Sequence, residues 1–361
     1  MLLSFLSIVL HILIDYLPSF LSSRIQAALF LITLIAPKSV PSRVGAVSYW
    51  INNYNAKVYS SRPVSRKTRT ILLVHGNAPS GANDFRVVNL ARALASANPN
   101  HLVVVPHIAP FARMEIRYDP MIQIIQDVSR DKCLSPSGTV SIAGPCIPSG
   151  LSLIASTFVN VVDSFLCVGA HANFHACVRH CIKTCEREDS RYAINAMFST
   201  FLYPHDERVK AMCRAFCDDD HYQNIGKQSN ILNKLQKDYP EEAKTFNRLQ
   251  NDMVFLKEVI DTSVDHHKTQ LTKLSPIEYV DRLNCKSVVL IHAKKDDVVP
   301  PEHCMVLKEA IDKTRKVNTS ALVTKLLNHG DQVPLTIAVL PEVLTALNTV
   351  SLFFSTISYT R

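Results

Sequence analysis

The 361-residue sequence predicts an α/β fold in which a mostly parallel central sheet is covered by helices on both faces. Short apolar segments of strand length alternate with longer segments whose apolar residues recur at helical spacing, which is typical of consecutive β-α units. Glycine is scarce, at nine residues, and five of these lie next to predicted strand ends. Glycine allows tight turns and close approach of backbone to a ligand, so the strand ends are expected to carry the functional site.

Composition limits the classes of partner. Apolar residues make up 47% of the chain and charged residues 19%, which is ordinary for a folded protein with an additional apolar segment. The formal net charge is +8, but lysine and arginine are scattered among acidic residues. The densest basic run, residues 62–69, has no aromatic platform or basic helix beside it. We therefore expect no nucleic-acid partner.

The first 37 residues hold two apolar runs, residues 1–14 and 27–36, and Asp15 and Pro18 follow the first run. Neither run reaches the roughly 20 apolar residues that a transmembrane helix needs. Residues 1–37 are predicted to associate with a membrane, as an anchor, a pair of in-plane helices or one broken span. The endoplasmic reticulum or another endomembrane is the expected location. The alternative is an apolar segment that packs on the domain itself.

Residues 38–69 are predicted to form a linker and a first edge strand, because they are polar but carry several aromatic residues. The first part of the core follows at residues 70–170. Its predicted elements are strands at 70–74, 102–105, 139–143 and 165–168, and helices at 85–97, 121–128 and 151–162.

Strand signals stop between residues 171 and 275, where helical stretches such as 231–236 and 253–260 alternate with polar segments. This part is predicted to be a helical cap inserted into the sheet domain. The second part of the core is placed at residues 276–361. It is expected to contain strands at 287–293 and 321–327 and helices at 301–310 and 340–354.

The segment GPCIPSG, residues 144–150, joins a predicted strand to an apolar helix, which is the setting of a nucleophile elbow. The residues two positions either side of the nucleophile must be small or compatible with a turn. Cys146 meets this condition with Gly144 and Pro148, whereas Ser149 would be flanked by bulky residues. A thiol at Cys146 would also lie at a helix N-terminus, where the helix dipole stabilises a thiolate. The alternative is a buried structural cysteine in an inert turn.

A cysteine nucleophile needs a base, a group that orients the base, and donors for the developing oxyanion. Asp296 and Asp297 follow one predicted strand, and His329 follows the last one. The order of nucleophile, acid and histidine along the chain is that of α/β-hydrolases. The backbone N–H groups of Ile147 and of Asn77 are candidate oxyanion donors.

Six segments resemble the α/β-hydrolase superfamily of esterases and lipases, especially a branch with a helical cap before the acid strand. The resemblance covers about residues 70–355. The segments are VHGNAPSGANDFRVVNLARALA, VSIAGPCIPSGLSLIAS, SFLCVGAHANF, LSPIEYVDRL, VVLIHAKKDDVVPPEHC and TKLLNHGDQ.

The resemblance implies an α/β-hydrolase fold and roles for five residues. Cys146 falls on the position of the nucleophile, where cysteine replaces the usual serine. Asp296, rather than Asp297, falls on the acid and His329 on the base. Asn77 and Ile147 fall on the oxyanion positions. No cofactor is implied.

The expected function is a membrane-associated hydrolase that cleaves an ester or thioester through an acyl-enzyme on Cys146. The expected substrate is a small-molecule acyl ester or a lipid. Two alternatives stay open at this point. The chain could be a catalytically inactive membrane interaction protein with a hydrolase-like fold, or an acyltransferase in which an alcohol replaces water.

Cysteine and histidine also crowd residues 171–185. Cys177, Cys181 and Cys185 recur every four residues and so share one face of a predicted helix. This spacing matches no common structural zinc pattern. Because cysteine often behaves as a small hydrophobic residue, these side chains are expected to lie in the core, and no metal site is predicted.

Overall fold

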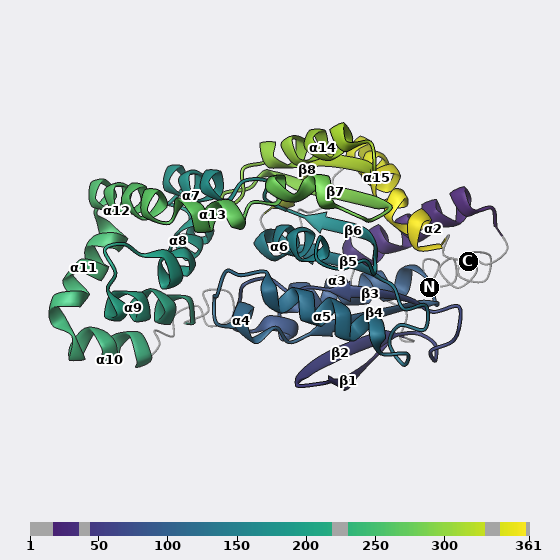
Figure 1. Ribbon diagram of the computed structural model, residues 1–361, viewed down its shortest axis with the longest axis horizontal. Coiled ribbons are helices and arrows are strands. Elements are labelled where there is room, and N and C mark those ends of the chain that lie inside the picture. Colours follow the sequence, from purple (N-terminus) through teal and green to yellow (C-terminus); the bar gives the residue numbers. More distant parts are fainter. Residues whose placement is uncertain (1–16, 36–43, 219–229, 329–339, 359–361) are drawn as a thin grey trace.

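The computed structural model describes residues 17–35, 44–218, 230–328 and 340–358. Its centre is an eight-stranded sheet in the order β1-β2-β4-β3-β5-β6-β7-β8 (Figure 1). The strand β2 pairs antiparallel with β1 and β4, and all other neighbours are parallel. The predicted α/β fold, with a mostly parallel central sheet and helices on both faces, is confirmed. The strands are β1 (Gly45–Ile51), β2 (Tyr54–Ser60), β3 (Arg69–Leu73), β4 (His101–Pro106), β5 (Val140–Pro145), β6 (Val162–Val168), β7 (Ser287–Lys295) and β8 (Asn318–Asn328).

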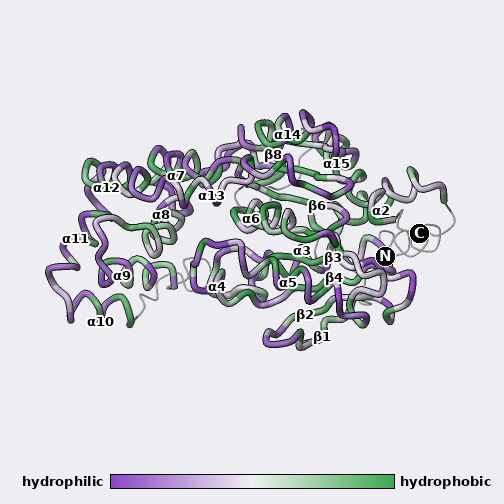
Figure 2. The backbone as a smooth tube through the Cα atoms, viewed as in Figure 1, coloured by the Kyte–Doolittle hydropathy of each residue, from purple (hydrophilic) through white to green (hydrophobic). Residues whose placement is uncertain are grey.

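The central strands are apolar on both faces, because each face is covered by helices. In β3, Ile71 and Leu73 pack into one hydrophobic cluster and Leu72 packs into another. In β4, Val103 packs into the same cluster as Ile71, and Val104 packs into the same cluster as Leu72. This alternation follows from the two-residue period of side chains along a strand. Figure 2 shows hydrophobic residues along the strands at the centre of the sheet.

Three helices cover each face of the sheet. Residues of α5, α6 and α14 share one hydrophobic cluster with the sheet, and residues of α2, α3 and α15 share the other. The helices of the first face are α5 (Asp119–Arg130), α6 (Cys146–Ser156) and α14 (Glu302–Thr314). Those of the second face are α2 (Ser19–Ile35), α3 (Phe85–Ala97) and α15 (Leu340–Ser358).

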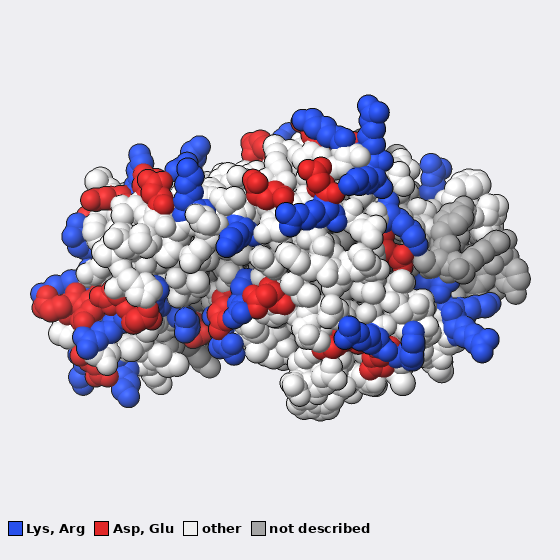
Figure 3. Space-filling view, viewed as in Figure 1, with Lys and Arg blue, Asp and Glu red and all other residues white. Residues whose placement is uncertain are grey.

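The chain between β6 and β7 forms only helices in its described residues. These helices gather beyond one end of the sheet (Figure 1), and their outer surface carries many charged side chains (Figure 3). We call them the helical insertion. Its members are α7 (Phe174–Lys183), α8 (Glu188–Phe201), α9 (Glu207–Asp218), α10 (Asn230–Asp238), α11 (Pro240–Asn251), α12 (Met253–His266) and α13 (Lys268–Lys273).

The segment before the core contains a hairpin, whereas the sequence predicted a single edge strand there. Ile51 of β1 pairs with Tyr54 of β2, so Asn52 and Asn53 form a two-residue turn. Asn52 has a φ of 49°, a conformation that asparagine tolerates better than most residues and that hairpin turns of this length favour. The turn was missed because the segment lacks the Asn-Gly or Asp-Gly pair that usually marks such a hairpin.

The second apolar run of the N-terminus lies within α2, which packs against α3 and α15. Ala27 and Phe30 are buried, and the ring of Phe30 meets the edge of Phe354 at a centroid distance of 5.8 Å. The described part of this run therefore packs on the domain itself, which was the alternative to membrane association. The first run, residues 1–14, lies outside the described residues, and membrane association through it stays a prediction. No helix within the described ranges has both the length and the apolar character needed to cross a membrane.

Phe354 should be a main support of this helical layer. Its side chain is 0% exposed, touches Phe30 and stacks on His101 at a centroid distance of 5.6 Å. We expect Phe354→Ala to lower the free energy of unfolding in urea by about 3–5 kcal/mol, because it leaves a cavity. Leu344→Ala on the same helix, where the side chain is 59% exposed, should cost under about 0.5 kcal/mol. Equal losses in the two variants would contradict the packing of α15 on α2.

Candidate active site

The turn after β5 holds Cys146 in a conformation that is rare for a residue with a side chain. Its φ is +55°, in the left-handed region, which costs roughly 1–2 kcal/mol for a residue other than glycine. The helix α6 begins at Cys146 itself, although its apolar spacing predicted a start at Leu151. The N–H of Ile147 belongs to the first turn of this helix, where N–H groups have no partner within the helix, so it can serve a ligand beside the thiol.

Close backbone approaches fix the position of this turn. Gly150, in the first part of α6, lies so near His171 that a Cβ atom there would be 2.4 Å from the ring nitrogen Nδ1. Burial lowers the pKa of His171 to about 4, so the ring is neutral at pH 7 and its Nε2 donates to the carbonyl oxygen of Leu274 (2.7 Å). The helix that carries Cys146 is thereby held against the end of the helical insertion.

Asp296 follows β7 and is 5% exposed. Its Oδ1 atom accepts hydrogen bonds from the backbone N–H groups of Val298 (2.9 Å) and Val299 (2.8 Å). The ring nitrogen Nε2 of His292 lies 3.3 Å from Oδ2, and Nε2 of His180 donates to the Asp296 carbonyl oxygen at 2.9 Å. These contacts hold the carboxylate in one orientation.

Gly169, which follows β6, lies close to both Asp296 and Cys146. A Cβ atom built on Gly169 would lie 3.6 Å from Oδ2 of Asp296 and 3.8 Å from the backbone nitrogen of Cys146. The carboxylate and the nucleophile turn therefore both lie close to one glycine, whose φ is +71°. Gly169 was not among the predicted site residues, although it is one of the nine glycines and follows a predicted strand.

The loop that carries the first predicted oxyanion donor is fixed by His75. The carbonyl oxygen of Gly76 can only accept a hydrogen bond and the N–H of Ile108 can only donate one. The ring of His75 therefore carries its hydrogen on Nδ1, which donates to Gly76 (2.7 Å), and accepts at Nε2 (2.9 Å). Burial lowers the pKa of His75 to about 4, which keeps this neutral form at pH 7. His75 is structural and is not a candidate base.

The neighbouring Asn77 is held by the helical insertion. Its carbonyl oxygen accepts a hydrogen bond from the Tyr192 hydroxyl on α8 at 3.1 Å, and its Nδ2 donates to the carbonyl oxygen of Glu115 at 3.3 Å. Sequence reasoning missed Tyr192, because nothing in a helical pattern shows which distant loop a helix touches.

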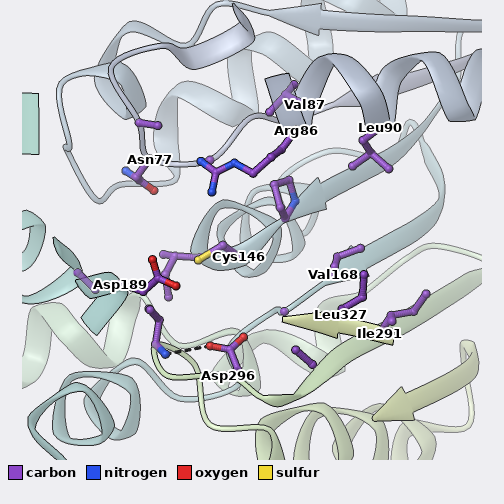
Figure 4. A pocket seen from close by; sticks show the side chains of 18 of the residues that line it. Asn77, Arg86, Val87, Leu90, Cys146, Val168, Asp189, Ile291, Asp296 and Leu327 are labelled. Carbon is purple, nitrogen blue, oxygen red and sulfur yellow. Dashed lines mark hydrogen bonds between the residues drawn. The ribbon is translucent and has the colours of Figure 1, made fainter. Parts of the chain in front are cut away.

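One cavity of about 750 Å³ is lined by Cys146, Ile147, Asn77 and Asp296 (Figure 4). Neither Asp297 nor Ser149 is among its lining residues, and Ser149 is only 2% exposed. The structure thus brings together four of the five predicted site residues. The fifth, His329, lies outside the described residues, so its role as base stays a prediction.

An ion pair between Asp84 and Arg86 lines the same cavity. Asp84 caps α3 by accepting from the backbone N–H of Arg86 at 2.8 Å. The Arg86 guanidinium binds both carboxylate oxygens, with Nε at 3.0 Å and Nη2 at 2.7 Å. Burial alone would raise the pKa of Asp84, but the hydrogen bonds and charge of Arg86 lower it below its ordinary value. The pair places a compensated positive charge near Cys146.

Cys177 of α7 lines the cavity too, but it is suited to packing rather than to attack. Complete burial, followed by the charges of Cys181, Cys146 and Asp296, raises its pKa well above the ordinary value, so it stays a neutral thiol. Its Sγ atom lies 3.6 Å from Nδ1 of His303. Among the described residues, no grouping of three or more cysteine, histidine, aspartate or glutamate residues could hold a metal ion.

Comparison with known proteins finds solved structures of low sequence identity. No protein-family model matches the chain, and no curated protein matches it. A puromycin-hydrolysing peptidase of Mycobacterium tuberculosis is 12% identical, with a TM-score of 0.47 over 88% of this chain and 40% of that one. The acylaminoacyl peptidase of Pyrococcus horikoshii is 13% identical, with a TM-score of 0.45 over 86% and 40%. The Pyrococcus furiosus esterase is 12% identical, with a TM-score of 0.43 over 88% and 93%. The chain thus spans about 40% of the length of the two peptidases.

The close contact at Gly150 gives a stability prediction. Gly150→Ala should lower the free energy of unfolding by about 1–3 kcal/mol, because the new methyl group would overlap the buried ring of His171. Gly76→Ala is the matched control, since a Cβ atom there would meet nothing within 4 Å. Urea unfolding of both variants measures the difference. A Gly150→Ala protein as stable as the Gly76→Ala protein would show that α6 does not approach His171 in this way.

Proposed function

We propose that the protein hydrolyses carboxylic esters or thioesters through an acyl-enzyme on Cys146. The observation that supports this most is the left-handed turn that places Cys146 at the start of α6, in a cavity that it shares with the buried carboxylate of Asp296. Backbone strain at a cavity is often part of a catalytic arrangement.

In the first half of the reaction, the sulfur of Cys146 attacks the substrate carbonyl carbon, and the thiol proton passes to His329. The negative charge that develops on the carbonyl oxygen is stabilised by the N–H groups of Ile147 and Asn77. The tetrahedral intermediate then collapses. The bond to the leaving group breaks, and the alcohol or thiol departs with the proton from His329, leaving a thioester on Cys146.

In the second half, His329 takes a proton from a water molecule, and the resulting hydroxide attacks the acyl carbon. The bond to Cys146 breaks, the carboxylic acid leaves and the proton returns to the sulfur. Asp296 holds the imidazole in the tautomer that this transfer requires and stabilises the imidazolium.

The strand pairing supports His329 as the base. Asn328, the last residue of β8, pairs with Lys295 of β7, and Lys295 directly precedes Asp296. His329 directly follows Asn328 in the chain. The two adjacent strands thus end side by side at the residues before the proposed acid and the proposed base.

Substitution of the nucleophile tests this proposal. Cys146→Ala should lower kcat/KM for 4-nitrophenyl acetate by at least about a thousandfold and abolish labelling by a fluorophosphonate probe. Asp296→Asn should lose about as much, because the histidine would be held in the wrong tautomer. Cys146→Ser should keep measurable labelling, since the fold ordinarily uses serine.

Cys133→Ala is the matched control, because Cys133 is an exposed thiol away from the cavity. It should label and turn over like the unchanged protein. Hydrolysis that survives in Cys146→Ala would refute the proposed nucleophile. A folded, unchanged protein without hydrolysis or labelling would instead favour an inactive interaction protein.

A further inference from the structure

The cavity continues past Cys146 into an apolar part that the proposed chemistry does not use. This apolar lobe is lined by Phe30, Leu34, Val87, Leu90, Ile291 and Leu327. These side chains come from α2, α3, β7 and β8, which are far apart in the sequence. The lobe is therefore a property of the assembled fold and of the second helical layer in particular.

On the opposite side of Cys146, polar side chains lie among apolar residues of the helical insertion such as Val178 and Met197. Asn77, Arg86 and Asp189 line this part of the cavity, which we call the polar end. Figure 4 shows the guanidinium of Arg86 directed toward Asn77, and in this view Asp189 lies on the same side of Cys146. Leu90, Ile291 and Leu327 lie on the other side of Cys146 in the same view. The sulfur thus lies at the boundary between an apolar and a polar environment.

A substrate that fits this cavity must have an apolar group for the lobe and a more polar group for the polar end. The volume of 750 Å³ lies within the range of about 300–1,000 Å³ that small-molecule sites occupy. An acetyl group would leave the apolar lobe filled with water at an apolar surface. An unbranched acyl chain would cover this surface, and burial of each methylene group favours binding by about fourfold.

We propose that the apolar lobe binds the acyl chain of a medium- or long-chain ester, while the polar end receives the leaving group. The carbonyl carbon then lies at Cys146, between the two. Phe30 and Leu34 make α2 a wall of the lobe, so the N-terminal helix determines which chain length fits. This inference rests on the proposed hydrolase function and names its substrate class.

The first test is the dependence of kcat/KM on chain length, measured with 4-nitrophenyl acetate, butyrate, octanoate and palmitate. The value should rise by about fourfold for each added methylene group until the lobe is full. Leu327→Trp should fill the lobe and raise the acetate-to-octanoate ratio of kcat/KM by at least about tenfold. Leu34→Ala should act in the opposite direction and shift the preferred chain to a longer one.

The matched control is Leu344→Trp, which adds the same ring to an exposed site outside the cavity. It should leave the ratio unchanged. Thermal unfolding of each variant identifies a loss that comes from misfolding. A ratio that Leu327→Trp does not change in a folded protein, or a flat dependence on chain length, would overturn the assignment of the lobe.

A binding experiment separates this inference from the proposed function. Unchanged and Cys146→Ala proteins are titrated with a fluorescent analogue of palmitate, and the Leu327→Trp protein is titrated beside them. Binding that Leu327→Trp weakens at least about tenfold supports the lobe even if no ester is hydrolysed. Hydrolysis of acetate without any binding of the analogue supports the proposed chemistry and refutes the lobe.

Discussion

The left-handed backbone of Cys146 is the constraint on which the site depends. It turns the chain sharply between β5 and α6, so Cys146 and Ile147 both line one cavity. Such a conformation is unfavourable for cysteine and persists only where its surroundings determine it. Two features of the surroundings determine the conformation of Cys146. The strand β5 is paired on both sides, and Gly150 brings α6 into contact with His171. Stability elsewhere in the fold offsets the strain at the turn.

Neutral buried histidines extend this rigidity to the rest of the site. His75 fixes the loop before Asn77 through both ring nitrogens, and His171 fixes the end of the helical insertion beside α6. Burial lowers the pKa of both, which makes each ring a permanent hydrogen-bonding group near pH 7 rather than an acid or a base. The imidazole that exchanges protons in the proposed mechanism must therefore be another one, and the strand ends support His329 for this role.

Much of the fold could be predicted because the strands of the core are short, apolar and separated by helices of regular spacing. The positions of Cys146, Asn77 and Asp296 followed from the rule that sites lie at strand ends. What could not be predicted depends on contacts between distant residues. An apolar run such as residues 27–36 has the same pattern whether it faces lipid or, as Phe30 does, another helix. The roles of Gly169 and Tyr192 appear only once β6 and α8 are placed beside the turn and the Asn77 loop.

Acylation of the Cys146 sulfur during turnover can be observed by peptide mapping with mass spectrometry. The protein is mixed with 4-nitrophenyl octanoate, quenched in acid and digested. If Cys146 is the nucleophile, the peptide that contains it gains an octanoyl mass, and the peptide that contains the exposed Cys133 gains none. Consumption of the ester with Cys146 unmodified, or equal acylation of Cys133, would contradict it.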